Sequence, residues 1–282
     1  MVIVTGTKRS GTSLWMQILI QGGLSHIGEA FPSVWSQSIS GANPKGFYES
    51  RLRTGVYYAT NPDPKTGNYL RPKETRKHAV KVFIPGVIRS DIAFLHRVNA
   101  SMRDWRAYSR SLAKLYAQED EWLRNNPNKG ESPQDAVDRA NRLRSPLPAP
   151  VEWFLENYEL VRDFAARRYP INFVSYEALL ADPEPLVNKV LDWVGEGDLE
   201  AAMGAIDTTL NRSSSPDRVP EEADLKDAHR RVFDDLYGAI HERGQLPQSL
   251  LPDLNDTWLA LQEEFGSLSR ERGREEAVSV DE

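Results

Sequence analysis

Short apolar runs alternate with amphipathic stretches along most of this chain. The runs are rich in β-branched residues and are bounded by polar segments, which is the composition of buried strands. They lie at residues 2–4, 78–84, 92–98 and 171–175. Strands of this kind, separated by helical segments, predict a parallel sheet flanked by helices.

The stretches between and after these runs place apolar side chains at the spacing of amphipathic helices. One helix is expected at residues 12–21, and another opens at Pro183 with Asp182 as its N-cap. The other helices are expected at residues 101–123, 153–168, 222–243 and 256–267, with a short one near 134–143. We therefore predict a single domain over residues 1–282, an α/β fold with a P-loop-type parallel sheet flanked by helices.

Composition narrows the classes of function. The net charge is −6 and the pI is about 5.5, which argues against general affinity for nucleic acid or for anionic membranes. The chain has no Cys, so disulfides, thiolate catalysis and Cys-ligated metals are excluded. No apolar run reaches the ~18 residues of a membrane span, and the start reads as a strand and not as a signal peptide. A soluble cytoplasmic protein is expected.

The segment with the clearest chemistry is the turn between the first strand and the first helix, GTKRSGTS at residues 6–13. A glycine-rich turn at this place aims backbone N–H groups at one point, and the helix dipole adds partial positive charge. Cations and hydroxyls complete a phosphate cradle at the carboxyl end of a strand, where open α/β sheets bind ligands. The residues expected to bind are Lys8, Arg9, Ser10, Gly11, Thr12 and Ser13.

This turn is close to a Walker A sequence but departs from it at one place. Gly6 and Gly11 have the expected spacing, but the lysine that should follow the second glycine is Thr12. The loop carries its cation at Arg9 instead. A nucleotide kinase or NTPase with a degenerate Walker A sequence stays open as an alternative, as does a nucleotide-binding module without catalysis.

Residues 8–13 (KRSGTS) resemble the 5′-phosphosulfate loop of the sulfotransferase family, written (K/R)SGT(T/S). Three later segments resemble a bacterial group of that family: NPKGFYE at 43–49, VSYEALLADP at 174–183 and the segment at 202–212. The resemblance implies transfer of a sulfuryl group from 3′-phosphoadenosine 5′-phosphosulfate (PAPS), the co-substrate, to a hydroxyl or amine of an acceptor, without a metal. It also implies that Arg9 contacts the transferring group.

The family binds the 3′-phosphate of PAPS through an Arg at a strand end and a Ser eight residues later, and this chain offers two registers for that pair. Arg97 ends an apolar run, but a tryptophan stands eight residues on. Arg103 resembles the Arg of the family's RDPR signature and has Ser111 eight residues later, although the residues before it look too polar for a buried strand. The strand pattern favours Arg97, and both registers stay open. Arg212 is a third cation that could close over the nucleotide.

Two further positions bear on the transfer step. Lys81 lies inside an apolar strand, where an unpaired Lys is unfavourable, and it resembles a lysine that many sulfotransferases keep near the leaving group. One branch of the family has a His base two residues later, but that position here is Phe83. Other members use a carboxylate in a Gly-Glu pair about twenty residues after the loop cation. Glu29, which stands twenty residues after Arg9, is therefore the predicted general base, with Glu49 as its rival.

The acceptor is predicted only by class, as a small molecule or glycan. The helical segment at residues 101–168 is expected to act as a lid over it, since such segments carry specificity. The aromatic side chains of this segment suit either the acceptor site or the core: Trp105, Tyr108, Trp122, Trp153 and Tyr158.

Overall fold

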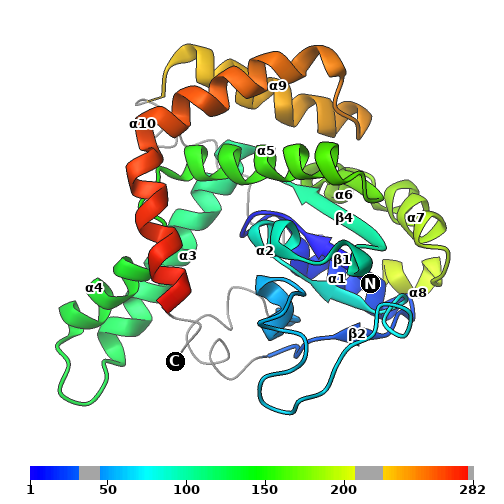
Figure 1. Cartoon of the computed structure of the whole chain (residues 1–282), viewed down its shortest axis with the longest axis horizontal. Helices are drawn as coiled ribbons and strands as arrows, with labels where there is room; N and C mark the ends of the chain where they lie inside the picture. Colours follow the sequence, from blue (N-terminus) through cyan, green and yellow to red (C-terminus); the bar gives the residue numbers. More distant parts are fainter. Residues whose placement is uncertain (32–44, 207–224, 279–282) are drawn as a thin grey trace.

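The computed structural model describes residues 1–31, 45–206 and 225–278, with the side chains of the last helix described as far as residue 266. Its centre is a five-stranded, all-parallel sheet with the strand order β2-β3-β1-β4-β5. Helices surround this sheet (Figure 1), so the prediction of an α/β fold with a P-loop-type parallel sheet is confirmed. The strands are β1 (Val2–Thr5), β2 (His26–Ile27), β3 (Ala79–Lys81), β4 (Arg97–Met102) and β5 (Ile171–Ser175).

The helices divide between the two faces of the sheet. Figure 1 shows α5 (Ala149–Arg167) and α9 (Asp227–Arg243) side by side, and both pack in the larger core cluster, with α9 also contacting β5. Within the described part of the chain none of these helices is both long and apolar enough to cross a membrane. They are α1 (Thr12–Gln21), α2 (Ile84–Arg89), α3 (Trp105–Asn125), α4 (Pro133–Leu143), α5 (Ala149–Arg167), α6 (Tyr176–Ala181), α7 (Pro183–Val194), α8 (Leu199–Met203), α9 (Asp227–Arg243) and α10 (Leu251–Val278).

The alternation of side chains along β1 separates the core into two clusters. Successive strand residues point to opposite faces of a sheet. Ile3 packs in the larger cluster, with side chains of α2, α3, α5, α9 and α10. Val2 and Val4 pack in the other, with side chains of α1, α7 and α8. The central strand is therefore covered on both faces, which is why it reads as an uninterrupted apolar run.

The carboxyl end of β3 comes earlier than the sequence predicts. The apolar run at residues 78–84 predicts one strand, but pairing with β1 ends at Lys81. The chain then turns into α2, which begins at Ile84 with Pro85 in its first turn, a position that proline favours. This early end makes Lys81 the last residue of β3, at the carboxyl end of the strand.

The strand β4 lies further along the chain than its apolar pattern predicts. The run at 92–98 opens with a 3-10 turn, and the strand itself has the sequence RVNASM. Asn99 on this strand accepts a hydrogen bond from Asn172 of β5 at 3.4 Å, and the Ser101 hydroxyl donates to the backbone oxygen of Ser10 at 2.6 Å. The strand is buried from Val98 to Met102 although it carries these polar side chains, so the prediction that this segment is too polar for a buried strand was wrong. The Ser101 hydroxyl and the Asn99 amide oxygen have partners, whereas Nδ2 of Asn99 has none among the described residues.

Several other bounds agree with the pattern, but α10 (Leu251–Val278) extends well beyond the helix predicted at 256–267, and α3 begins at Trp105 and not at residue 101. β5 and α1 have the predicted residues, α4 covers the predicted short helix, and α7 opens at Pro183. The pattern missed β2, α2, α6 and α8, because a strand of two residues and helices of five or six residues are too short for a period to show.

The aromatic residues of the proposed lid segment lie mostly in the core. Trp105, Tyr108, Trp153 and Tyr158 belong to the larger buried cluster, and Trp122 packs partly buried against α4. Four of the five therefore hold α3 and α5 to the sheet. Trp105, Tyr108 and Trp153 are at most 1% exposed and do not line a surface that an acceptor could reach, whereas Tyr158 also lines a hollow between α5 and the start of α10.

Candidate functional site

The turn at residues 6–13 leaves the carboxyl end of β1, the middle strand of the sheet. Its two glycines are required by close approaches. A Cβ on Gly6 would lie 2.3 Å from the backbone oxygen of Ser101, at the end of β4. Gly11 has a φ of +89°, and a Cβ there would lie 2.3 Å from the ring of Tyr176, which follows β5. The turn is thereby packed against the ends of two neighbouring strands.

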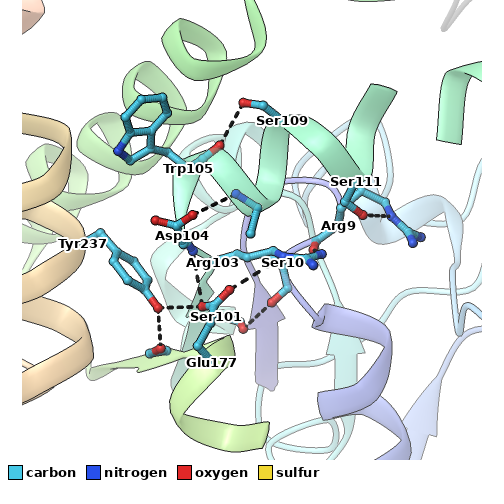
Figure 2. A network of polar contacts seen from close by, with 12 residues as sticks. Arg9, Ser10, Ser101, Arg103, Asp104, Trp105, Ser109, Ser111, Glu177 and Tyr237 are labelled. Carbon is cyan, nitrogen blue, oxygen red and sulfur yellow. Dashed lines mark hydrogen bonds and ion pairs between the residues drawn. The ribbon is translucent and has the colours of Figure 1, made fainter. Parts of the chain in front are cut away.

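Arg9 is the residue through which the turn meets α3. It adopts a φ of 65°, a left-handed conformation that costs a non-glycine residue free energy and is concentrated at functional sites. Its Nε donates to the Ser111 hydroxyl at 3.0 Å, and its backbone oxygen accepts from Nη1 of Arg103 at 2.8 Å. Figure 2 shows Arg9, Arg103 and Ser111 together at this edge of the sheet. The structure thus brings the second predicted register, Arg103 and Ser111, to the turn at residues 6–13, the predicted phosphate loop.

Arg103 directly follows β4 and is 4% exposed. Its guanidinium lies over the Tyr176 ring, 4.8 Å from the centroid, and its backbone oxygen accepts from the Trp153 indole at 2.9 Å. Burial lowers the pKa of Arg103, while Tyr176 and the carboxylate of Glu177 act in the opposite direction. A buried, oriented guanidinium at a strand end is well placed to pair with a phosphate.

Arg97, the alternative that the strand pattern favours, lies at the amino end of β4, at the opposite end of the strand from the turn at residues 6–13. It begins β4 and pairs in register with Val2 at the start of β1. At ~3.3 Å per residue it lies about 20 Å from Arg103 along the strand. Its Nε donates to the backbone oxygen of Trp193 at 3.1 Å, in the last turn of α7, where the helix dipole favours a cation. The prediction that Arg97 is the strand-end cation was wrong, because the apolar run before it is a turn.

Lys81 lies at the end of β3 with its ammonium in the interior. The side chain is 5% exposed, and the nitrogen donates to Glu49 at 2.9 Å, to the Ser13 hydroxyl at 3.2 Å and to the backbone oxygen of Phe47 at 3.2 Å. Burial lowers the pKa of Lys81, and the charge of Glu49 opposes that effect. An ammonium has three protons, so these three acceptors satisfy it fully. Lys81 therefore ties the phosphate loop to the segment that carries Glu49.

The two candidate bases lie side by side but in different surroundings. Glu29 and Glu49 form an antiparallel bridge, exchanging backbone hydrogen bonds of 2.9 and 3.1 Å. Glu49 is buried and bonded to Lys81, and its second oxygen lies 3.3 Å from Arg53. Taking a proton would weaken both of these ion pairs. Glu29 is exposed beside them.

The other residues of the loop divide between internal and outward roles. The Ser10 hydroxyl is buried and donates to the backbone oxygen of Thr7 at 2.7 Å, so it stabilises the turn itself. Thr12 is buried at the start of α1, whereas Ser13 is partly exposed. Lys8 is also partly exposed and lies near Tyr116 of α3, where its charge opposes the burial that raises the pKa of Tyr116.

Sequence reasoning missed several residues that the fold brings to this site. Ser101 and Glu177 bond to groups of the loop and of the Arg103 segment, and Tyr176 packs against Gly11. Tyr176 and Glu177 stand in the segment YEALLADP, whose position after a strand was the available signal. Nothing in the sequence marked Ser101, since a serine inside a strand has no characteristic pattern.

Arg212, the third predicted cation, lies outside the described residues. Among the residues that are described, no group of three or more His, Asp or Glu side chains is placed to hold a metal ion. Comparison of the chain with protein-family models, with curated proteins and with solved structures found no match.

Proposed function

We propose that this protein transfers a sulfuryl group from PAPS to a hydroxyl or amine of a small-molecule or glycan acceptor. The observation that carries the proposal is the direct contact between the two basic parts of the site. Arg9 of the loop bonds to Ser111, and Arg103 bonds to the backbone of Arg9. A nucleoside that carries anionic groups at both the 5′ and the 3′ position of its ribose would be held by both parts at once.

In this proposal each part of the site binds one of the two anionic groups of the nucleotide. The N-terminus of α1 and the loop residues 8–13 hold the 5′-phosphosulfate, because backbone N–H groups and cations meet there. Arg103 and Ser111 hold the 3′-phosphate, for which a guanidinium offers paired donors. These residues fit such a ligand, since the left-handed backbone at Arg9 is supported by the same Arg103 that takes the second phosphate.

The transfer step needs an in-line acceptor, charge neutralisation at the leaving oxygen and removal of the acceptor proton. The acceptor oxygen or nitrogen forms the new bond to sulfur, the bond between sulfur and the 5′-phosphate oxygen breaks, and adenosine 3′,5′-bisphosphate leaves. Arg9 stabilises the charge that moves onto the leaving phosphate. Lys81 contributes through Ser13, whose hydroxyl it holds at 3.2 Å.

Glu29 is proposed as the base that takes the acceptor proton. Its support is position: it is exposed, and its backbone pairs with that of Glu49, which Lys81 ties to the turn at residues 6–13. Glu49 is the weaker candidate, since both of its oxygens are engaged by cations. In this arrangement Glu49 is held by Lys81 and keeps its own segment in place, and Glu29 meets the acceptor.

Nucleotide binding tests the proposal before any acceptor is known. Isothermal titration calorimetry would compare adenosine 3′,5′-bisphosphate, 5′-AMP, and ATP with Mg²⁺. We expect the 3′-phosphate to improve affinity at least tenfold, which corresponds to the ~1.5 kcal/mol of a charge-assisted contact. Equal affinity for the first two ligands, or a clear preference for ATP with Mg²⁺, would reject the proposal in favour of a nucleotide kinase or NTPase. Mass spectrometry of metabolite extracts incubated with PAPS would then identify the acceptor by the gain of one sulfate.

A further inference from the structure

A second polar network joins Arg103 to α9, in a part of the chain where the sequence predicts no functional role. Its centre is the carboxylate of Glu177, in the first turn of α6. Oε2 accepts from the Tyr237 hydroxyl at 2.7 Å and from the backbone N–H of Asp104 at 3.2 Å. Oε1 lies 3.8 Å from Nε of Arg103 (Figure 2). The carboxylate is therefore held most closely on the side that faces α9.

The position of the Tyr237 hydroxyl is set by core packing. Its ring stacks on His241 with centroids 5.4 Å apart, and its oxygen lies 3.2 Å from the hydroxyl of Ser175 at the end of β5. One turn earlier on α9, Phe233 stacks on Phe154 in the main core, with centroids 4.7 Å apart. A hydroxyl anchored in this way offers its proton at a defined point.

The Tyr237 hydroxyl keeps its proton over the whole physiological range. Burial, together with the charge of Glu177, raises the pKa of Tyr237 well above its ordinary value. Tyr237 is therefore a permanent donor to Oε2 of Glu177. Without that donor, the carboxylate would be attracted onto the guanidinium of Arg103, where carboxylates favour a closer bidentate pairing. Such a pair would compete with a phosphate for the same cation.

We propose that Tyr237 is a positioning residue: through Glu177, it sets how Arg103 meets the 3′-phosphate of the nucleotide. This inference rests on the proposed function, in which Arg103 binds that phosphate. The contrast with the pair formed by Lys81 and Glu49 supports it. The charged atoms of that pair lie 2.9 Å apart, whereas Glu177, which Tyr237 holds on the side that faces α9, stays 3.8 Å from Arg103.

The test is the affinity of Tyr237→Phe for adenosine 3′,5′-bisphosphate and for 5′-AMP, measured by calorimetry. We expect the affinity for the bisphosphate to fall about tenfold, the scale of one charge-assisted contact, while the affinity for 5′-AMP stays within about twofold. Tyr169→Phe is the matched control. Its hydroxyl also donates to a carboxylate, Asp163, at 2.9 Å, and burial also raises the pKa of Tyr169. This control should leave both affinities unchanged.

A second variant keeps the test decisive if Tyr237→Phe fails to fold. Glu177→Asp retains the charge but shortens the side chain by one methylene, so it draws the carboxylate away from both Tyr237 and Arg103. Arg103 then loses the position that Tyr237 sets through Glu177, and the same selective loss is expected. If either folded variant binds both ligands as the wild type does, or loses both affinities equally, Tyr237 and Glu177 have only a structural role. If the wild type itself does not distinguish the two ligands, the proposed function fails and this inference falls with it.

Discussion

Replacement of Lys81 by Met measures how strongly the buried ion pair beneath the phosphate loop stabilises the fold. The side chains of Lys81 and Glu49 are 5% and 9% exposed, and the charged atoms lie 2.9 Å apart. Removing one partner of a buried pair typically costs about 3–5 kcal/mol, because the other charge stays buried. Arg53 still lies 3.3 Å from the second Glu49 oxygen, so we expect the lower end of that range, a loss of about 3 kcal/mol in the free energy of unfolding. Met is similar in size to Lys, so the loss contains little from a cavity.

Urea denaturation followed by far-UV circular dichroism is the assay. Arg53→Met is the matched control: Arg53 bonds to the same carboxylate but is 39% exposed, so its loss should stay below about 1 kcal/mol. Adding Glu49→Gln to Lys81→Met should recover more than half of the stability, since the unpaired buried charge is then gone. A loss of less than about 1 kcal/mol for Lys81→Met, or no recovery in the double variant, would refute the reasoning.

Three further predictions concern the site and the pH dependence. Arg103→Met should weaken binding of adenosine 3′,5′-bisphosphate at least about tenfold and spare 5′-AMP in calorimetry, whereas Arg97→Met should change neither affinity; the reverse pattern would restore Arg97 as the phosphate ligand. Glu29→Gln should lower turnover by about 10²–10⁴-fold, measured by mass of the sulfated product, with nucleotide affinity unchanged; wild-type turnover across pH 6 to 9 would exclude it as the base. Burial, with Arg76 and Arg97 nearby, lowers the pKa of His96 from 6.5 to about 4, so the folded state binds fewer protons between these values and stability rises with pH across that window. His96→Gln should flatten this rise in a series of thermal melts, and an unchanged slope would contradict the assignment.

Local pattern was enough to find the central elements and the loop that they position. The apolar run at 2–4, the glycine-bounded turn at 6–13 and the helix at 12–21 are adjacent in sequence, so their order alone predicts a strand, a turn and a helix. β5 and α4 were equally accessible, the first as an apolar run between polar segments and the second as a short helical stretch near residues 134–143. In each case the interactions that define the element lie within it or next to it.

Tertiary structure decided which residues stand at the carboxyl ends of the strands, where the candidate site lies. The sequence could not place β4, because the burial of Asn99 and Ser101 depends on partners on β5 and in the phosphate loop. Because β4 lies further along the chain than its apolar pattern predicts, Arg103 and not Arg97 stands at its carboxyl end.

The same holds for the groups that hold the site together. Lys81 meets Glu49 across 32 positions of the chain, and Tyr237 reaches Glu177 across 60. A charged or hydroxyl side chain has the same sequence signature whether it faces water or a partner. Its role is set by desolvation and by the geometry of distant groups, and these exist only once the sheet and its helices have assembled.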